Sequence, residues 1–175
     1  MNKILLAFLC LLLFSSPLLA KDKDKDREFF TVTKVNDGNS VTLNNGQTIQ
    51  LTGVRCPSPD DANEKIKKWG VAAKVFLEKM ILNQKVWLSG QKDHENKTYA
   101  FVLFVSNLER MSGVVDQGYM PFWGTAGKFM ANRELVDNGF CSTSSPFSFK
   151  YRSQFNELEK TARLKQRGMW TDFAQ

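Results

Sequence analysis

The stretch that decides the fold is V35-N-D-G-N-S-V-T-L-N-N-G-Q-T-I-Q-L-T-G-V-R-C-P-S58. Its β-branched residues alternate along the chain on both sides of Asn45-Gly46, a dipeptide typical of type I′ turns. The pattern predicts a β-hairpin, with one strand before the dipeptide and one after it.

Periodic patterns extend this hairpin into a larger domain. Apolar and β-branched residues fall at every second position in five segments, which we predict to be strands: residues 29–35, 40–44, 47–54, 84–89 and 98–105. Apolar residues three or four apart predict two helices, at residues 63–82 and 153–166. Trp69, Trp87 and Trp170 are expected in the core rather than at a ligand. The sequence thus predicts an α+β domain.

Several short motifs, in a fixed order, resemble those of the staphylococcal nuclease-like (thermonuclease) family. The family has a D-G-D-T/S-V turn, an R-L-x-G-I/V-D-x-P-E segment, an aromatic-Gly helix start and a terminal A-x-x-x-x-x-G-L/M-W. The corresponding stretches here are D37-G-N-S-V41, Q50-L-T-G-V-R-C-P-S58, W69-G70 and A162-R-L-K-Q-R-G-M-W170. The resemblance covers most of residues 30–170. It implies a five-stranded OB-like β-barrel with packed helices, a scaffold that often binds nucleic acids.

The N-terminus has the pattern of an export signal. Residues 1–20 combine Lys3, an apolar run of eleven residues and a small-residue end at Ala20, as in secretory signal peptides. The alternative, a transmembrane anchor, would need a run of roughly twenty apolar residues. We therefore expect a signal peptide (1–20), a charged linker (21–28) and one nuclease-like domain (29–175), exported to a periplasm or secreted, with no stable membrane span after cleavage.

Net charge and cysteine content give further limits on the chain that remains after removal of residues 1–20. Removing residues 1–20 takes away one lysine, so the net charge of +6 falls to +5, and the sequence pI is about 9.3. Two of the three cysteines remain, Cys56 and Cys141, either as a disulfide or as two buried thiols. The resemblance suggests that both lie beside the active-site side of the barrel, so a bridge between them is plausible.

The metal and base positions of the family carry the wrong chemistry here. By the resemblance, the two carboxylates that hold calcium correspond to Asn39 and Arg55, and the general base corresponds to Ser58. Of the acidic, basic and proline positions in the D-G-D turn and the R-L-x-G segment, only Asp37 and Pro57 match the family outright. Calcium prefers oxygen ligands with negative charge, so a site with Arg55 in place of an aspartate should repel it.

The two phosphate-binding arginines of the family are also replaced. By the resemblance they correspond to Gln50 and to Lys97 or Thr98. A lost base lowers a rate by about a hundredfold to ten-thousandfold, and a lost transition-state donor by about a hundredfold or more. We therefore expect a catalytically inactive domain without a cofactor, in which Arg55 and Lys97 attract anions.

An active phosphodiesterase with a relocated site is the alternative. Its calcium or catalytic groups would come from carboxylates and a histidine near the family positions: Asp37, Asp60, Asp61, Asp93, His94 and Glu95. A carboxylate shifted along a proline-bounded loop points elsewhere, so we favour the inactive interpretation. Calcium is expected only under the alternative.

The sequence also departs from the family near residues 105–130. V114-V-D-Q-G-Y119 and L135-V-D-N-G-F140 both resemble the single L-V-x-x-G-aromatic helix ending of the family, which implies an insertion. The segment M120-P-F-W-G-T-A-G-K-F-M130 is aromatic and glycine-rich. It forms either an exposed contact surface or, as we favour, a packed loop.

Aromatic and basic residues alternate near the C-terminal helix. Tyr151 lies between Lys150 and Arg152, close to Phe147 and Phe149. In family nucleases, a tyrosine-bearing loop near here stacks on the nucleotide base. Stacking aromatics beside cations suit single-stranded nucleic acid. The predicted partners are accordingly nucleic acid, another phosphate-bearing ligand or a protein, bound by Arg55, Lys97, Lys150, Tyr151 and Arg152.

Overall fold

A computed structural model describes residues 28–106 and 127–173 of the chain. The predicted signal peptide, nearly all of the linker and residues 107–126 of the predicted insertion lie outside the described residues. No helix in the described part is both long enough and apolar enough to span a bilayer.

Six strands form the main sheet, in the order β3-β2-β1-β5-β6-β7. Their bounds are β1 Phe30–Asp37, β2 Ser40–Leu43, β3 Thr48–Leu51, β5 Lys85–His94, β6 Lys97–Ser106 and β7 Gly127–Met130. Neighbouring strands in this order are antiparallel. A separate pair, β4 (Val54–Arg55) with β8 (Ser142–Thr143), is antiparallel as well.

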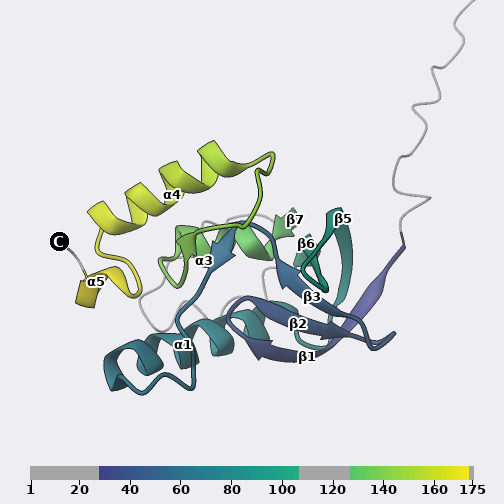
Figure 1. The fold of residues 1–175 in the computed structure, drawn as a ribbon, viewed down its shortest axis with the longest axis horizontal. Coiled ribbons are helices and arrows are strands. Elements are labelled where there is room, and N and C mark those ends of the chain that lie inside the picture. The colour runs from purple at the N-terminus through teal and green to yellow at the C-terminus, as the bar shows by residue number, and fades with distance from the viewer. Residues whose placement is uncertain (1–27, 107–126, 174–175) are drawn as a thin grey trace, which may run out of the picture.

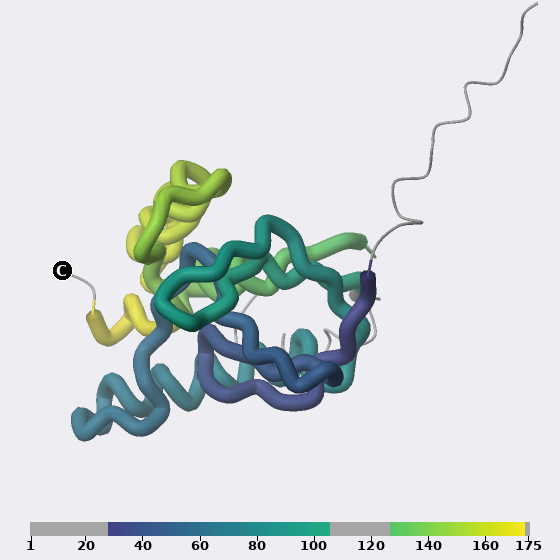
Figure 2. The backbone as a smooth tube through the Cα atoms, turned by 45° about the vertical axis from the view of Figure 1, so that its right-hand side comes forward, coloured from purple at the N-terminus to yellow at the C-terminus, as the bar shows by residue number. Residues whose placement is uncertain are grey.

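One additional pairing closes the sheet into a barrel. Strand β3 pairs in parallel with β6, with Ile49 opposite Thr98 and Leu51 opposite Ala100. Strands β1, β2, β3, β6 and β5 therefore form a closed ring, which Figure 2 shows, and β7 extends it beside β6. The predicted five-stranded OB-like barrel is confirmed.

The helices pack on one side of this barrel, as Figure 1 shows. Their bounds are α1 Glu64–Ile81, α3 Ala131–Asp137, α4 Arg152–Leu164 and α5 Trp170–Phe173. The short helix α3 contacts both α1 and α4 as well as strand β6. It therefore joins the helical layer to the barrel.

Periodicity predicted α1 and its buried face correctly. The helix begins after Asn63, whose side-chain oxygen accepts hydrogen bonds from the backbone of Lys65 and Ile66. Trp69, Trp87 and Trp170 are 5%, 6% and 5% exposed, which confirms that they belong to the core. Helix α4 buries only Phe155 and Ala162, so most of its surface faces solvent.

The turn at Asn45-Gly46 is not the predicted type I′ turn. Of the two residues, only Gly46 has a positive φ, of 82°, whereas a type I′ turn needs positive φ at both. The Gly46 amide donates to the Leu43 carbonyl, and the Leu43 amide donates to the Gln47 carbonyl. This is the pattern of a three-residue loop whose glycine forms a bulge. The Asn45 side chain favours it by accepting a hydrogen bond from the Gln47 amide at 3.0 Å.

The predicted strand 47–54 is broken at Gly53, which has a φ of 84°. A side chain at this position would collide with the Phe149 ring, which lies 2.8 Å from the site of an added Cβ. The chain therefore turns at Gly53, and β4 leaves the barrel to pair with β8. The prediction missed this break because it depends on Phe149, almost a hundred residues away in sequence.

A buried asparagine ties the barrel to helix α3. Asn132 is fully buried, and its Oδ1 accepts a hydrogen bond from the Val102 amide at 2.9 Å. Its Nδ2 donates to the Thr52 carbonyl at 2.9 Å and to the Ala100 carbonyl at 3.1 Å. One side chain thus satisfies backbone groups of β6 and of the chain after β3.

Two carboxyl groups of the helical layer have shifted pKa values. Asp172 of α5 accepts a hydrogen bond from Trp69 Nε1 at 2.8 Å and pairs with Lys68, and these contacts lower its pKa. Burial raises the pKa of Glu134 in α3 to about 8, although Arg133 lies 3.3 Å from one of its oxygens and opposes the shift.

Candidate functional site

The Asp37–Asn39 turn joins β1 to β2 at one end of the barrel. Asp37 Oδ1 accepts a hydrogen bond from the Asn39 amide at 2.8 Å, so this carboxylate already holds the turn together. The Asn39 carbonyl accepts a hydrogen bond from the Leu51 amide, which joins the turn to the end of β3. The turn that carries a metal ligand in the family therefore keeps its shape through its own hydrogen bonds.

The Arg55–Ser58 loop begins in the small sheet of β4 and β8. Arg55 pairs with Ser142, and Ser142 Oγ donates a hydrogen bond to the Arg55 carbonyl at 3.2 Å. The Arg55 side chain is exposed. Ser58 Oγ accepts a hydrogen bond from the Asp60 amide at 3.2 Å. Arg55 is thus fixed through its backbone and Ser58 accepts a local hydrogen bond through its hydroxyl, and both residues are exposed to solvent.

A disulfide links Cys56 of this loop to Cys141, just beyond the end of α3. Their Cα atoms are 4.2 Å apart across 85 residues of sequence. Cys141 is fully buried, and its amide donates to the Leu135 carbonyl in α3. The bond therefore anchors the exposed loop to a buried helix end.

A cavity of about 360 Å³ opens beside this loop. It is lined by loop residues, by the segment after α3 and by the C-terminal region: Arg55, Cys56, Pro57, Ser58, Asp61, Ile66, Ser142, Met169 and Phe173. Lys97 is not part of this lining. The polar groups that line the cavity are the Arg55 cation, the Asp61 carboxylate and the hydroxyls of Ser58 and Ser142.

Gln50 and Lys97 belong to neighbouring barrel strands. Gln50 of β3 pairs with Ser40 of β2 on one side and with Tyr99 of β6 on the other. Lys97 begins β6, two residues before Tyr99. The structure therefore brings the positions of the two family arginines to one part of the barrel, and Arg55 lies in the separate β4–β8 sheet.

The hairpin of β5 and β6 carries a cluster of basic side chains on one face. Lys92 pairs with Tyr99 and His94 pairs with Lys97 across the two strands. Because side chains alternate between faces along a strand, these four share one face, which we call the basic hairpin face. Asp93 and Thr98 point to the opposite face, where Thr98 Oγ1 donates to Asp93 Oδ1 at 2.7 Å. Of the two candidates for the second arginine position, Lys97 therefore lies on the basic hairpin face and Thr98 on the opposite face.

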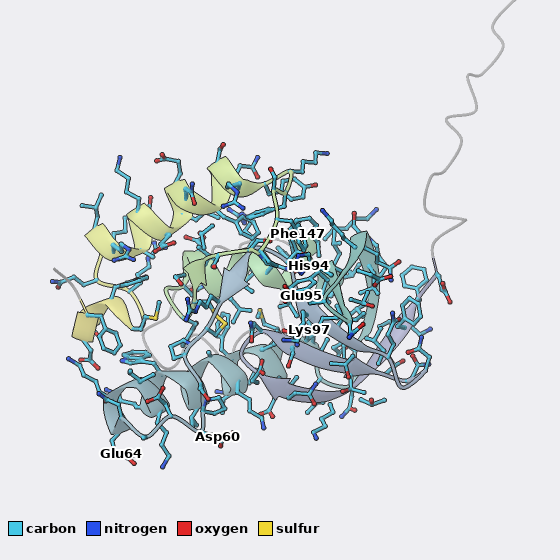
Figure 3. All side chains as sticks on the ribbon, viewed as in Figure 1. Asp60, Glu64, His94, Glu95, Lys97 and Phe147 are labelled. Carbon is cyan, nitrogen blue, oxygen red and sulfur yellow. A yellow bond between two sulfur atoms is a disulfide. The ribbon has the colours of Figure 1, made fainter. Side chains whose placement is uncertain are left out.

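Phe147 packs on the basic hairpin face. Its ring centroid lies 5.2 Å from that of Tyr99 and 5.9 Å from that of His94, and Lys92 Nζ lies 4.4 Å from the Phe147 centroid. Figure 3 shows Phe147, His94 and Lys97 gathered at this end of the barrel. The cluster combines aromatic rings with cations, and in the described part of the chain Lys92 and Lys97 form no ion pair.

The predicted ligand-binding residues after Phe149 are partly committed to packing. Tyr151 lies edge-on against the core residue Phe101, with centroids 5.0 Å apart. Lys150 lies over the Tyr151 ring at 5.3 Å. Arg152 lies over the Phe149 ring at 4.9 Å and donates to the Phe147 carbonyl at 2.8 Å. These side chains hold the aromatic loop against the barrel.

The acidic groups of the alternative, relocated site are dispersed. Figure 3 shows Asp60 near the start of α1, well away from His94 and Glu95 at the hairpin end. His94 Nδ1 is 3.9 Å from Glu95 Oε2, and Asp93 lies on the other face of the hairpin. Within residues 28–106 and 127–173, no three acidic, histidine or cysteine side chains converge as metal ligands would.

The donor chemistry at the family metal position does not suit calcium. Of the residues there, Asn39 offers a neutral amide, Arg55 a cation and Ser58 a hydroxyl. Of the two nearby carboxylates, Asp37 accepts a backbone hydrogen bond within its own turn, and Asp61 lines the cavity beside Arg55. Calcium sites use six to eight oxygen ligands with several carboxylates, so these residues do not fit the ion.

Sequence comparison identifies the family. The sequence profile of the staphylococcal nuclease homologues matches residues 48–172. The chain belongs to this family. It is 25% identical over 158 residues to a thermonuclease of Staphylococcus intermedius, covering 88% of this chain and 83% of the relative. It is 23% identical over 155 residues to a thermonuclease of Staphylococcus hyicus, covering 84% and 78%. The resemblance inferred from short motifs is therefore confirmed.

Sequence reasoning missed two members of the hairpin cluster, Lys92 and Tyr99. The available signal was the two-residue spacing of Lys92 to His94 and of Lys97 to Tyr99, which places each pair on one strand face. Connecting the two strands requires the turn at Glu95-Asn96, where φ is 48° and 59°. Both values are positive without glycine, so no turn motif marked the position.

Proposed function

We propose that this staphylococcal nuclease homologue is an exported, non-catalytic binding module for phosphate-bearing polymers, with nucleic acid as the favoured ligand. Residues 1–20 direct export in this proposal, and Lys97 and Arg55 attract the anionic ligand. The observation that carries the proposal is the basic hairpin face, where Lys92, His94 and Lys97 lie beside aromatic rings.

The chemistry of this face supports binding rather than hydrolysis. Lysines neutralise phosphates and release counterions, and aromatic rings stack with bases without distinguishing them strongly. Hydrolysis in this family needs carboxylates around a metal ion, whereas the corresponding positions here hold Asn39, Arg55 and Ser58. The fold is retained in this proposal, and its ligand is bound without being cleaved.

Binding of a labelled short single-stranded DNA, measured by fluorescence anisotropy over a series of salt concentrations, tests the proposal. We expect affinity to fall as salt rises, and Lys97→Ala to lower the slope of log K against log salt by about 0.7, the value for one lost contact to a single strand. Lys85→Ala is the matched control, because this exposed lysine lies at the other end of β5. Equal effects of the two substitutions would contradict binding at the hairpin face.

Arg55→Ala tests the second cation separately. If ligand also reaches the cavity beside the disulfide, this substitution weakens binding in the same salt series. Heparin in place of DNA tells whether stacking matters, because heparin carries anionic groups but no bases. A protein partner becomes the better proposal if neither polymer binds.

The names of the thermonuclease relatives favour a second candidate, an active phosphodiesterase with relocated catalytic groups. Calcium separates the two candidates. A rise in thermal stability with calcium supports a metal site, and a rise with phosphate-bearing ligand but not with calcium supports the binding module, because a ligand that binds only the folded state stabilises it.

A further inference from the structure

Two segments that the resemblance assigns to calcium meet at the disulfide. Cys56 lies directly after Arg55, one of the two positions that correspond to metal ligands, and Asn39 is the other. Gly38, next to Asn39, packs against Cys56: an added Cβ on Gly38 would lie 2.8 Å from Cys56 Cβ and 3.1 Å from Cys56 Sγ. The disulfide thus lies at the junction of the Asp37–Asn39 turn and the Arg55–Ser58 loop.

The contact between the two segments is direct. Cys56 Sγ is 3.0 Å from the Gly38 carbonyl oxygen, and because a disulfide sulfur carries no hydrogen, this is a packing contact rather than a hydrogen bond. The would-be Cβ of Gly38 also lies 2.7 Å from Ala73 Cβ of α1. The disulfide and α1 therefore both pack against the same side of the turn, at Gly38.

The other end of the disulfide is anchored in the core. Cys141 follows α3, and Phe140, beside it, stacks on Phe76 of α1 with centroids 4.4 Å apart. Helix α3 carries Asn132, which is hydrogen-bonded to the barrel. Because Cys56 is bonded to Cys141, the packing of Phe140 and α3 also restrains the loop that holds Arg55 and Ser58.

We propose that the Cys56–Cys141 disulfide replaces a bound metal ion as the cross-link that positions the Arg55–Ser58 loop against the Asp37–Asn39 turn. A metal ion joins two segments by coordinating both, whereas the disulfide holds the loop covalently and presses it on the turn. The loop then needs no carboxylates, and a cation such as Arg55 can occupy a former ligand position. The proposal concerns the same site as the proposed function but does not depend on its ligand.

Hydrogen exchange measured by mass spectrometry on the double variant Cys56→Ser with Cys141→Ser tests the positioning role. We expect peptides that cover residues 55–61 to exchange at least about tenfold faster than in the wild type, because local opening now has no covalent restraint. Peptides from β5 near Val86 serve as the internal control and should be accelerated less. Equal acceleration of both regions, or none in the loop, would overturn the proposal.

Metal rescue gives a readout that a general stabilising bond would not show. Adding Asn39→Asp, Arg55→Asp and Ser58→Glu to the serine variant restores the family carboxylates in a chain without the disulfide. We expect calcium, but not an equal ionic strength of sodium chloride, to slow exchange of residues 55–61 in this variant. The same carboxylate substitutions with the disulfide intact are the matched control, and calcium should slow loop exchange less there. Failure of calcium to slow the loop would overturn the equivalence.

Reduction of the wild-type protein offers a second route if the serine variant does not fold. Dithiothreitol breaks the sulfur–sulfur bond and closes to its own ring disulfide, so two electrons and two protons pass to the sulfurs of Cys56 and Cys141. Exchange of the loop should again rise selectively. Since none of these measurements includes DNA, a failed binding experiment and a failed loop experiment remain distinguishable.

Discussion

The disulfide region and the basic hairpin face differ in their side-chain chemistry and in how the chain is held there. The Arg55–Ser58 loop, which by the resemblance corresponds to the family loop with a metal ligand and the base, is held by a covalent bond and by the β4–β8 pairing. The hairpin face has no covalent restraint, yet it presents Lys92, His94 and Lys97 together. The first region is cross-linked and holds Asn39, Arg55 and Ser58 where the resemblance implies carboxylates, and the second presents two lysines beside aromatic rings.

Under our proposal, this difference illustrates how a fold can lose one chemistry and keep another. Metal binding needs several carboxylates at one point, so a few substitutions at Asn39, Arg55 and Ser58 are enough to remove it. Attraction of phosphate is distributed over several cations, so it does not depend on any single position. In our account, the domain therefore keeps the ability to bind anions after it has lost the ability to hydrolyse them.

The largest effect is expected at Asn132, the buried residue that ties the barrel to α3. Asn132→Leu should leave the Val102 amide and the Thr52 carbonyl without their side-chain partner, at about 1–3 kcal/mol for each buried group. The Ala100 carbonyl is affected less, because it also accepts from the Thr52 amide. Urea denaturation of this variant measures the loss. Asn156→Leu on the exposed face of α4 is the control, and a similar loss there would contradict this role for Asn132.

Loss of the disulfide comes next. For a loop of 85 residues, the chain-entropy model gives about 4 to 5 kcal/mol of stabilisation. Cys56→Ser with Cys141→Ser should lower the free energy of unfolding by an amount of this order, measured by denaturation. The hairpin region should keep its affinity for ligand if its geometry depends on β5 and β6 alone. A parallel loss of affinity would show that the two regions are coupled.

Glu134 makes the stability of the fold around α3, the helix just before Cys141, sensitive to pH. Its folded pKa of about 8 exceeds its ordinary value of 4.5, so the folded state holds the proton more tightly than the unfolded state. Its contribution to stability is complete below pH 4.5 and is lost as the pH rises to 8. The shift of roughly 3.5 units corresponds to at most about 5 kcal/mol at 1.4 kcal/mol per unit.

Glu134→Gln should remove this dependence and stabilise the protein at pH 9, measured as a difference in thermal midpoint from the wild type between pH 5 and pH 9. Glu157→Gln on the exposed surface of α4 is the control. If Glu134→Gln destabilised the protein more at pH 9 than at pH 5, the ion pair with Arg133 would outweigh burial and our account of this group would be wrong.

The smallest effect is expected for charge reversal on the hairpin. Lys92→Glu should weaken DNA binding without changing the thermal midpoint by more than about two degrees, because exposed substitutions generally change stability by less than about 0.5 kcal/mol. Glu95→Lys, in the turn of the same hairpin, should strengthen binding. If neither Lys92→Glu nor Glu95→Lys changed the affinity for DNA, binding at the hairpin face would be contradicted.

Much of this architecture could be predicted from local pattern. Alternation of apolar residues predicted the barrel strands, and the three-to-four spacing around Trp69 and Phe76 predicted α1, because these patterns depend only on near neighbours. The break at Gly53 and the bulged turn at Gly46 were missed, because Phe149 and the Asn45 side chain decide them.

The candidate site was predictable in part. The order of the motifs predicted the family and, by resemblance, pointed to Asn39, Arg55 and Lys97 along the chain, but it could not give their arrangement in space. The basic hairpin face depends on strand register after a bulge between Ser89 and Lys92, and on a turn without glycine at Glu95-Asn96. Such features follow from the packing of both strands, so no single segment reveals them.

The measurement that tests the central claim most directly is release of acid-soluble nucleotides from single-stranded DNA and RNA by the purified protein, with calcium and with a chelator. The variant Arg55→Ala with Lys97→Ala is assayed alongside it. We predict no release above background in either condition, together with salt-dependent binding of the same DNA by the wild type. Cleavage that requires calcium would contradict the account and direct attention to Asp37, Asp60, Asp61 and His94.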